Sequence, residues 1–201
     1  HLLGELGHRV DGGHQPAALA ELGYLRHYMR AVRVSLVAEL AMFEPALGRP
    51  FTADDVEEGT WINQLRGRKV SAVDYVYSRD ALIAYSRRLI GWWHDGHDLL
   101  LTPTVAVPPP PVGHLIEGDE RTLVERLVPI TAFTPQFNVS GQPAISLPLG
   151  TSTDGLPLGV QLVAAPGRED LLLQVAAQLE QAAPWHDRRP AIWAGAARPS
   201  T

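Results

Sequence analysis

The stretch that decides the fold runs from residue 144 to residue 164 and reads AISLPLGTSTDGLPLGVQLVA. Two apolar segments, 144–149 and 158–164, flank a polar stretch that contains Asp154 and Gly155. An Asp-Gly pair between apolar segments is a strong local signal for a β-hairpin, because both residues tolerate the backbone conformation of a tight turn. The sequence therefore predicts two antiparallel strands joined by this turn.

Further elements are predicted on either side of the hairpin. Residues 99–101 are three consecutive leucines followed by Thr-Pro-Thr. Such a short continuous apolar run is typical of a strand buried on both faces, which favours a parallel sheet inside helices. Residues 169–182 carry apolar side chains at helical spacing and predict the final helix, and residues 119–127 predict a shorter helix. The prolines at 108–111 predict a surface loop, because they cannot pair in a sheet.

The segment before residue 98 is predicted to be mainly helical. Apolar residues recur at helical spacing over residues 16–43, which predicts one long amphipathic helix that Pro45 and Pro50 end. A second helix is expected from about residue 53 to residue 67, and a third over residues 71–93.

Two local signals support these boundaries. Thr52 followed by Asp55 resembles a capping box at the start of the second helix. The opening sequence HLLGELGHRV is typical of the last turn of a helix, a stop at Gly7 and a strand, which favours a chain that begins inside a fold. Together these elements predict an α/β fold. We expect one domain, in which residues 1–97 are helical and residues 98–201 form a sheet and a closing helix.

Composition and charge limit the classes of function. The chain has 201 residues, of which 45% are hydrophobic and 19% charged, as is typical of a compact folded domain. The formal net charge is -5 without a dense basic stripe, so we expect neither a nucleic-acid partner nor a membrane partner. Because there is no long apolar run and no signal-peptide pattern, the cytoplasm is the expected location. With no cysteine, disulfides and a thiol nucleophile are excluded.

No local motif indicates a complete catalytic apparatus. The chain lacks a Gly-x-Ser-x-Gly elbow, a phosphate-binding glycine loop and a His-Glu-x-x-His motif. His94 and His97 with Asp98 come nearest to a metal site, but imidazoles are also favoured at a helix end by its negative dipole. His8 and His14 are best interpreted as part of a surface turn. We therefore predict no metal and no cofactor.

The segment from residue 134 to residue 150, TPQFNVSGQPAISLPLG, is harder to explain by packing alone. Asn138, Ser140 and Gln142 alternate with Gly141 and Pro143 directly before an apolar strand. This pattern predicts a tight, hydrogen-bonded turn that enters the core. Such turns often border a pocket, although a capped turn without a binding role is the simpler interpretation.

Three motifs in this order carry a resemblance to a known family. They are FNVSGQPAISLP at 137–148, DGLPLGVQLV at 154–163 and GRED at 167–170, and they resemble the C-terminal hallmark of amidase-signature enzymes. The stretch DLLLTPT at 98–104 looks like the strand and loop that help to wall the acyl pocket of that family. The resemblance implies the C-terminal part of an α/β/α fold with a mixed sheet covered by helices. It also implies hydrolysis of amide or ester bonds by a serine, a second serine in a cis peptide and a lysine, without metal.

No catalytic residue of that family transfers to this chain. The family carries its two serines and its lysine in the N-terminal half, and the glycine- and serine-rich stretch that holds the serines does not occur here. Lys69, the only lysine, follows Arg66, Gly67 and Arg68 in a polar turn. The resemblance instead implies a set of residues near the acyl site: Thr102, Pro103, Thr104, Phe133, Phe137 and Asn138. Trp61 or Tyr75 would shape the variable pocket, although each aromatic residue also fits a place in the core.

Three hypotheses follow for the function. The chain is an inactive C-terminal part of an amidase, or one chain of a split amidase that an N-terminal partner completes, or a scaffold or binding module without catalysis. In the first two cases we expect a small amide as the substrate of the complete enzyme and the N-terminal half as a partner. A divided sheet exposes unpaired backbone, so we also expect a homo-oligomer.

Overall fold

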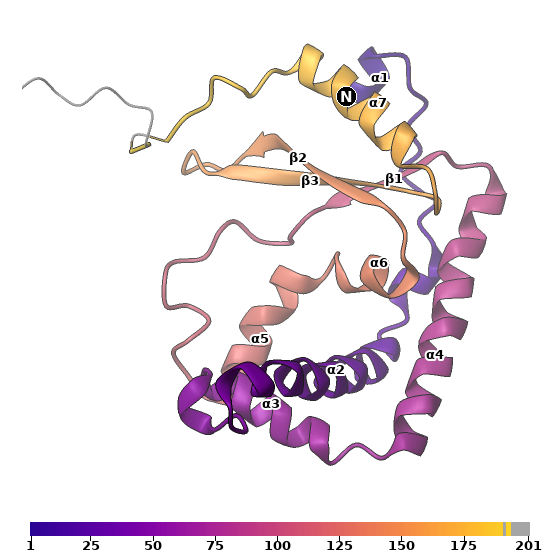
Figure 1. The fold of residues 1–201 in the computed structure, drawn as a ribbon. Coiled ribbons are helices and arrows are strands. Elements are labelled where there is room, and N and C mark those ends of the chain that lie inside the picture. Colours follow the sequence, from indigo (N-terminus) through magenta and orange to yellow (C-terminus); the bar gives the residue numbers. More distant parts are fainter. Residues whose placement is uncertain (191, 194–201) are drawn as a thin grey trace, which may run out of the picture. The chain divides into compact units, whose positions relative to one another are not determined.

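The computed structural model describes residues 1–190, 192 and 193 (Figure 1). They divide into two compact units. Unit 1 consists of His1–His14, Asp98–Thr134 and Gln142–Thr201, and unit 2 consists of Gln15–His97 and Pro135–Gly141. Unit 1 contains the sheet, and the described elements of unit 2 are all helical.

Unit 1 is built on a three-stranded sheet in the order β1-β3-β2, with β1 at Leu99–Pro103, β2 at Ala144–Thr151 and β3 at Pro157–Ala164. The predicted hairpin is confirmed, because β2 and β3 pair in antiparallel fashion around the turn at Gly155, whose φ is 79°. The α/β class is also confirmed, because helices accompany this sheet. All the strands described are antiparallel.

The prediction of a parallel, doubly buried strand at residues 99–101 is wrong. β1 pairs with β3 in antiparallel fashion, and burial alternates along it: Leu100 is 8% exposed and Leu101 50% exposed. Three leucines are too few to distinguish a strand buried on both faces from one whose alternate side chains point outward.

Helix α7, Glu169–Ala182, covers one face of this sheet (Figure 1). The helix has the predicted bounds, and its first turn carries Glu169 and Asp170, as the positive end of a helix dipole favours. Short helix α1, Leu2–Glu5, contributes Leu2 and Leu3 to the edge of this core. The strand predicted after Gly7 is not present, because residues 8–10 have no strand partner. The core residues are Leu147, Leu162, Ala164, Leu172, Val175, Ala176 and Leu179.

Helix α5, Glu120–Thr131, is the third helix among the described residues of unit 1. It starts where the sequence predicts, because the side chain of Asp119 accepts a hydrogen bond from the backbone N–H of Thr122 at 2.8 Å. The helix continues past residue 127 and includes Pro129.

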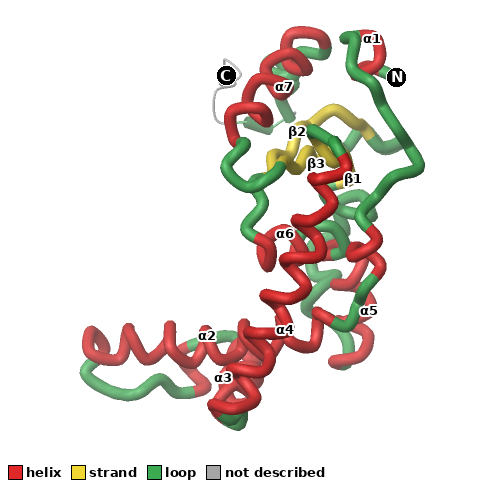
Figure 2. Tube along the Cα trace, turned by 90° about the vertical axis from the view of Figure 1, so that its right-hand side faces the viewer, coloured by secondary structure: helices red, strands yellow, loops and turns green. Residues whose placement is uncertain are grey.

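Three helices dominate unit 2: α2 at Tyr24–Leu47, α3 at Glu58–Arg68 and α4 at Ala72–Gly91 (Figure 2). The third follows the prediction closely, since Ser71 caps it by accepting from the N–H of Asp74. A short 3₁₀ turn, Trp92–Asp95, extends its C-terminal end. Among the described residues, none of the helices has the length and hydrophobicity needed to cross a membrane.

Three predicted boundaries of these helices are wrong. The predicted first helix is divided into a 3₁₀ turn at Ala17–Ala20 and α2, which includes Pro45, ends at Leu47 and is followed by Gly48 with a φ of 67°. Proline near the end of a helix removes only one hydrogen bond, so the left-handed glycine decides the stop. The capping box of Thr52 is present, but it caps the start of a 3₁₀ turn at Ala53–Asp55, and α3 starts only at Glu58.

The turn predicted before β2 also contains a helix that the sequence did not indicate. Residues Pro135–Ser140 form α6, which packs against α4. Gly141 follows with a φ of 67°, and its N–H donates to the carbonyl of Phe137 at 2.9 Å. The segment is therefore a helical turn closed by a left-handed glycine.

Helices α2 and α3 approach closely at Gly67. This glycine is buried, and a Cβ atom at its position would overlap the carbonyl group of Arg33 and lie 2.8 Å from a methyl group of Val37. Arg33 Nε also donates to the side chain of Asn63 at 2.9 Å across the same pair of helices. Only glycine fits this crossing without moving a backbone.

A polar cluster connects α2 to α4. His27 Nδ1 lies 3.2 Å from Ser78 Oγ, and Arg30 donates to the same hydroxyl at 3.1 Å. Ser78 is fully buried and His27 nearly so. Burial, and then the positive charges of Arg26 and Arg30, lower the pKa of His27 below its ordinary value.

Beside it, Tyr24 stacks on Tyr85 with ring centroids 4.3 Å apart and donates to Gln136 Oε1 at 3.2 Å. Burial raises the pKa of Tyr24 to about 12. Burial thus disfavours the charged form of this hydroxyl, which is the donor in the bond to Gln136.

We expect Gly67→Ala to lower the free energy of unfolding by about 1–3 kcal/mol, because the methyl group overpacks the crossing of α2 and α3. Gly59→Ala is the matched control, since a Cβ at Gly59 in α3 meets no atom within 4 Å. That control should leave stability unchanged or raise it by up to about 1 kcal/mol through helix propensity. Urea denaturation measures both, and equal effects would contradict the close approach.

We expect acid to destabilise the chain through His27. Its pKa is lower in the folded state, so the unfolded state binds more protons as the pH falls below about 6.5. The contribution of His27 to the free energy of unfolding is therefore fully present above that pH and is lost as the pH falls below it. The difference in free energy of unfolding between the chain and His27→Gln should therefore depend on pH between about 7 and 5. Parallel pH profiles for the two proteins would show that His27 has no such role.

Candidate functional site

Gln161 is the centre of a polar cluster on the sheet. Its Nε2 donates to Thr102 Oγ1 at 3.0 Å and to the carbonyl oxygen of Phe133 at 2.8 Å. Gln161 and Thr102 are opposite each other in the β1–β3 register, and both are buried. Side chains alternate along a strand, and Leu162 belongs to the core under α7. Gln161 and Thr102 therefore lie on the opposite face of the sheet.

A pair of hydroxyl groups continues this cluster on the same face. Thr104 Oγ1 and Ser146 Oγ are 2.6 Å apart, and Ser146 is opposite Gln161 in the β2–β3 register. Gly159 makes room for them, because a Cβ at this position would lie 2.7 Å from the Thr104 hydroxyl and 2.8 Å from that of Ser146. Strand β3 thus contributes in two ways: Gly159 leaves space for the hydroxyl pair, and Gln161 donates a hydrogen bond to Thr102.

The structure brings together half of the residues predicted near the acyl site. Thr102, Thr104 and Phe133 all belong to unit 1, and Thr102 and Phe133 share Gln161 as their hydrogen-bond donor. Pro103 is opposite Val160 in the sheet register, so its side chain is on the other face from Thr102. The role of each in substrate binding stays a prediction.

The other predicted residues belong to unit 2. Phe137 and Asn138 are on α6, where Phe137 is 4% exposed and Asn138 is exposed. Phe137 is therefore a buried core residue, which agrees with the alternative interpretation that the aromatic residues pack in the core. Trp61 on α3 and Tyr75 on α4 are half-buried.

Sequence reasoning missed Gln161, Ser146 and Gly159. One signal was available: Gln161 stands between valine and leucine in an otherwise apolar strand. A buried glutamine needs hydrogen-bond partners, so its position predicts polar neighbours on the adjacent strands. Ser146 and Gly159 carry no comparable signal, because their roles depend on the strand register.

The histidines and the lysine singled out in the sequence lie outside this polar cluster. Among the described residues, no group of three or more His, Cys, Asp or Glu side chains could hold a metal ion. His97 stacks on Trp92 with ring centroids 4.2 Å apart, His14 pairs with Asp11 at 2.8 Å, and His8 contacts Gln178 at 2.9 Å. Lys69 is exposed just after α3, where its positive charge interacts favourably with the negative C-terminal end of the helix dipole.

The polar cluster is suited to binding rather than to chemistry. Thr102, Thr104, Ser146 and Gln161 carry hydroxyl and amide groups that do not change charge near neutral pH. Such groups recognise neutral polar molecules, among them amides, through hydrogen bonds. Proton transfer to or from a substrate requires an acid or base that these four residues lack.

Comparison with known proteins assigns the chain to a family. The family model Amidase matches residues 15–173, so the chain belongs to the amidase family. Its relatives include the 6-aminohexanoate-cyclic-dimer hydrolases of Pseudomonas sp. strain NK87 and Paenarthrobacter ureafaciens, each 44% identical over 94% of the chain and 40% of the relative. A putative amidase AmiC of Mycobacterium tuberculosis strain H37Rv is 38% identical over 92% of the chain and 38% of the relative.

Solved structures agree with this assignment. The structure of a 6-aminohexanoate cyclic dimer hydrolase complexed with substrate has a TM-score of 0.87 and 44% identity over 94% of the chain and 41% of the solved chain. The chain therefore spans about 40% of the length of the curated relatives that it matches.

We expect Gln161→Leu to lower the free energy of unfolding by about 1–3 kcal/mol, because it leaves the carbonyl of Phe133 and the hydroxyl of Thr102 without their donor. Gln174→Leu, on the exposed side of α7, is the matched control and should change stability by less than about 0.5 kcal/mol. Chemical denaturation separates the two. A Gln161→Leu protein as stable as the control would show that the two hydrogen bonds contribute nothing.

Proposed function

We propose that this chain forms the substrate-binding scaffold of an amidase that hydrolyses carbon–nitrogen bonds by serine acyl transfer. The observation that carries the proposal is the 44% identity, over 94% of the chain, to a hydrolase whose solved structure matches with a TM-score of 0.87. Similarity at this level supports a shared reaction class, whereas the fold alone would not.

In this proposal the chain supplies contacts to the substrate and no reacting group. Thr102 and Thr104, held by Gln161 and Ser146, offer hydroxyl groups to the neutral amide and wall the acyl site with Phe133. We propose substrate contacts also for Pro103 in unit 1 and, separately, for Phe137 and Asn138 in unit 2. The nucleophilic serine, the second serine and the lysine are supplied outside these residues, so the chain alone is inactive.

The sheet supports completion by additional strands. In the order β1-β3-β2, both β1 and β2 have one edge without a strand partner among the described residues. Unpaired strand edges favour pairing with further strands. We propose that the N-terminal half of the enzyme pairs there, that the complete protein forms a homo-oligomer, and that it works in the cytoplasm.

The first substrate to test is the cyclic dimer of 6-aminohexanoate, which the names of the 44% identical relatives specify. It is a neutral diamide. It therefore suits a surface of hydroxyl and amide groups, which offers hydrogen bonds without a charge.

A chimera tests the proposal. This chain replaces the matching 197-residue region of the Pseudomonas hydrolase, and release of primary amine from the cyclic dimer is measured. We expect turnover by the chimera and none by the chain alone. Thr102→Val in the chimera should lower kcat/KM by about tenfold through loss of one hydrogen bond, whereas Thr153→Val in the hairpin turn should not.

Each outcome decides between the hypotheses. A chimera that folds but does not turn over the cyclic dimer or a simple aryl amide would support a non-catalytic module. Turnover by the isolated chain would contradict the absence of a catalytic group.

A further inference from the structure

Unit 2 contains an open pocket that the proposed function does not use. The pocket has a volume of about 450 Å³ and lies where the outer face of α4 meets α2 and α6. Positions 75, 79, 82, 83, 86 and 87 recur at the spacing of one helix face. The lining residues are Ala31, Tyr75, Arg79, Leu82, Ile83, Ser86, Arg87 and Val139.

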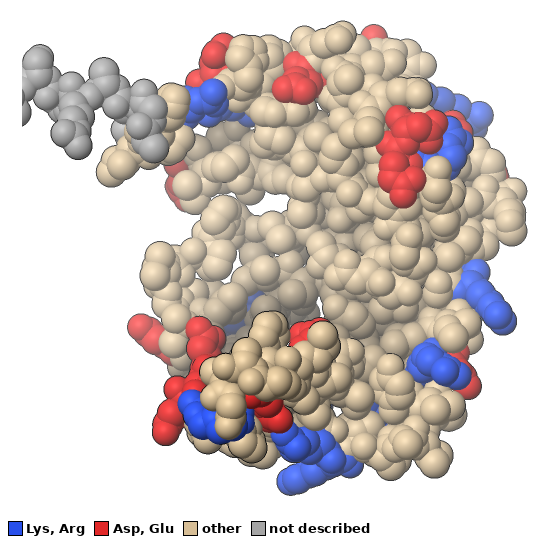
Figure 3. Space-filling view, in the orientation of Figure 1, with Lys and Arg blue, Asp and Glu red and all other residues tan. Residues whose placement is uncertain are grey.

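The floor of this pocket is apolar and its rim is basic. Ala31, Leu82, Ile83 and Val139 provide aliphatic surface from all three helices. Two exposed arginines, Arg79 and Arg87, also line the pocket, and none of the described residues that line it is acidic. Basic side chains mark the α4 edge in the space-filling view (Figure 3).

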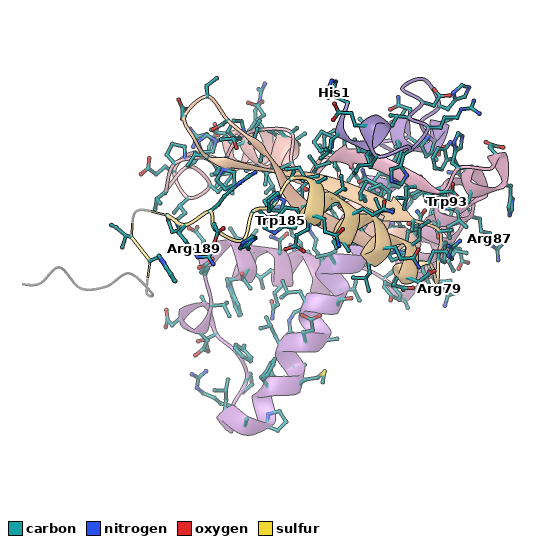
Figure 4. All side chains as sticks on the ribbon, turned by 90° about the horizontal axis from the view of Figure 1, so that it is seen from above. His1, Arg79, Arg87, Trp93, Trp185 and Arg189 are labelled. Atoms are coloured by element: carbon teal, nitrogen blue, oxygen red, sulfur yellow. The ribbon has the colours of Figure 1, made fainter. Side chains whose placement is uncertain are left out.

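The two arginines differ in their partners. Arg79 donates to the carboxylate of Asp80 at 3.0 Å, which offsets its charge. Within the part of the chain that the structure describes, Arg87 has no ion pair or hydrogen bond, whereas the neighbouring Arg88 pairs with Glu21 at 2.6 Å. Both project from the same helix (Figure 4). Arg87 therefore keeps its charge and all its donors for a ligand.

Uncharged donors accompany this charge. Ser86 precedes Arg87 in the pocket lining, and Tyr75 stands three turns earlier on the same helix face. The arrangement is one uncompensated guanidinium beside an aliphatic floor, with hydroxyl groups within the same pocket. An arginine binds a carboxylate through two parallel hydrogen bonds, and an aliphatic floor binds an alkyl chain.

We propose that this pocket binds a small amphiphilic carboxylate, with the carboxylate on Arg87 and the alkyl chain on Leu82, Ile83 and Val139. A cation is disfavoured by the uncompensated positive charge of Arg87. A neutral amide would form hydrogen bonds but would leave the charge of Arg87 uncompensated, so it binds more weakly.

Three probes with the same alkyl chain test this assignment: octanoate, octanamide and octylammonium. Isothermal titration calorimetry with the full chain should detect octanoate, with octanamide at least about tenfold weaker and octylammonium weakest. Arg87→Gln should weaken octanoate by about tenfold or more and should leave octanamide unchanged. Ile83→Asp, which places a negative charge on the floor, should abolish octanoate binding.

The matched controls are on the same unit but outside the pocket. Arg68→Gln on α3 and Val73→Asp at the start of α4 are exposed and should bind octanoate as the unchanged chain does. The proposal is overturned if the three probes bind alike, if Arg87→Gln binds octanoate normally, or if no octanoate binding occurs at millimolar concentration. Circular dichroism of each variant verifies that its helices remain formed.

Discussion

Strand β3 is the element on which unit 1 depends, because its two faces have opposite requirements. Leu162 and Ala164 must remain buried under α7, and Gln161 must find hydrogen-bond partners on the other side. A shift of the register by one residue would place the glutamine in the apolar core and the leucine on the polar face. Both errors are costly, so the alternation along one strand determines where β1 and β2 pair.

Helix α4 has the corresponding role in unit 2. Its buried residues Ser78 and Tyr85 contact His27 and Tyr24 of α2, and its outer positions carry Arg79 and Arg87. The buried side includes polar groups that are bonded to one another, so the helix pair depends on hydrogen bonding as well as on apolar packing. One helix thus supplies both a core and an exposed binding surface.

The sequence predicts correctly those features that depend on interactions between neighbouring residues. It predicts less well those that depend on residues far apart in the chain. The hairpin at Asp154-Gly155 and the bounds of α7 depend on neighbouring residues, and both are confirmed. The direction of β1 and the position of Pro45 inside α2 depend on distant partners or on the next glycine, and the predictions there were wrong. In the candidate site, Thr102 and Phe133 were identified by resemblance. Gln161 was missed because its partners are 59 and 28 residues away along the chain.

The hydrogen bonds of Gln161 also fix a direction of donation. A backbone carbonyl accepts but never donates, so the contact with Phe133 identifies the nitrogen end of the glutamine amide. The same nitrogen donates to Thr102, so the hydroxyl oxygen of Thr102 is the acceptor. The hydroxyl proton of Thr102 does not take part in that contact and is left to point away from Gln161. The carbonyl oxygen of Phe133 thus orients the amide of Gln161. As a result Thr102, whose hydroxyl could donate or accept, accepts from Gln161 and can present its proton to another acceptor.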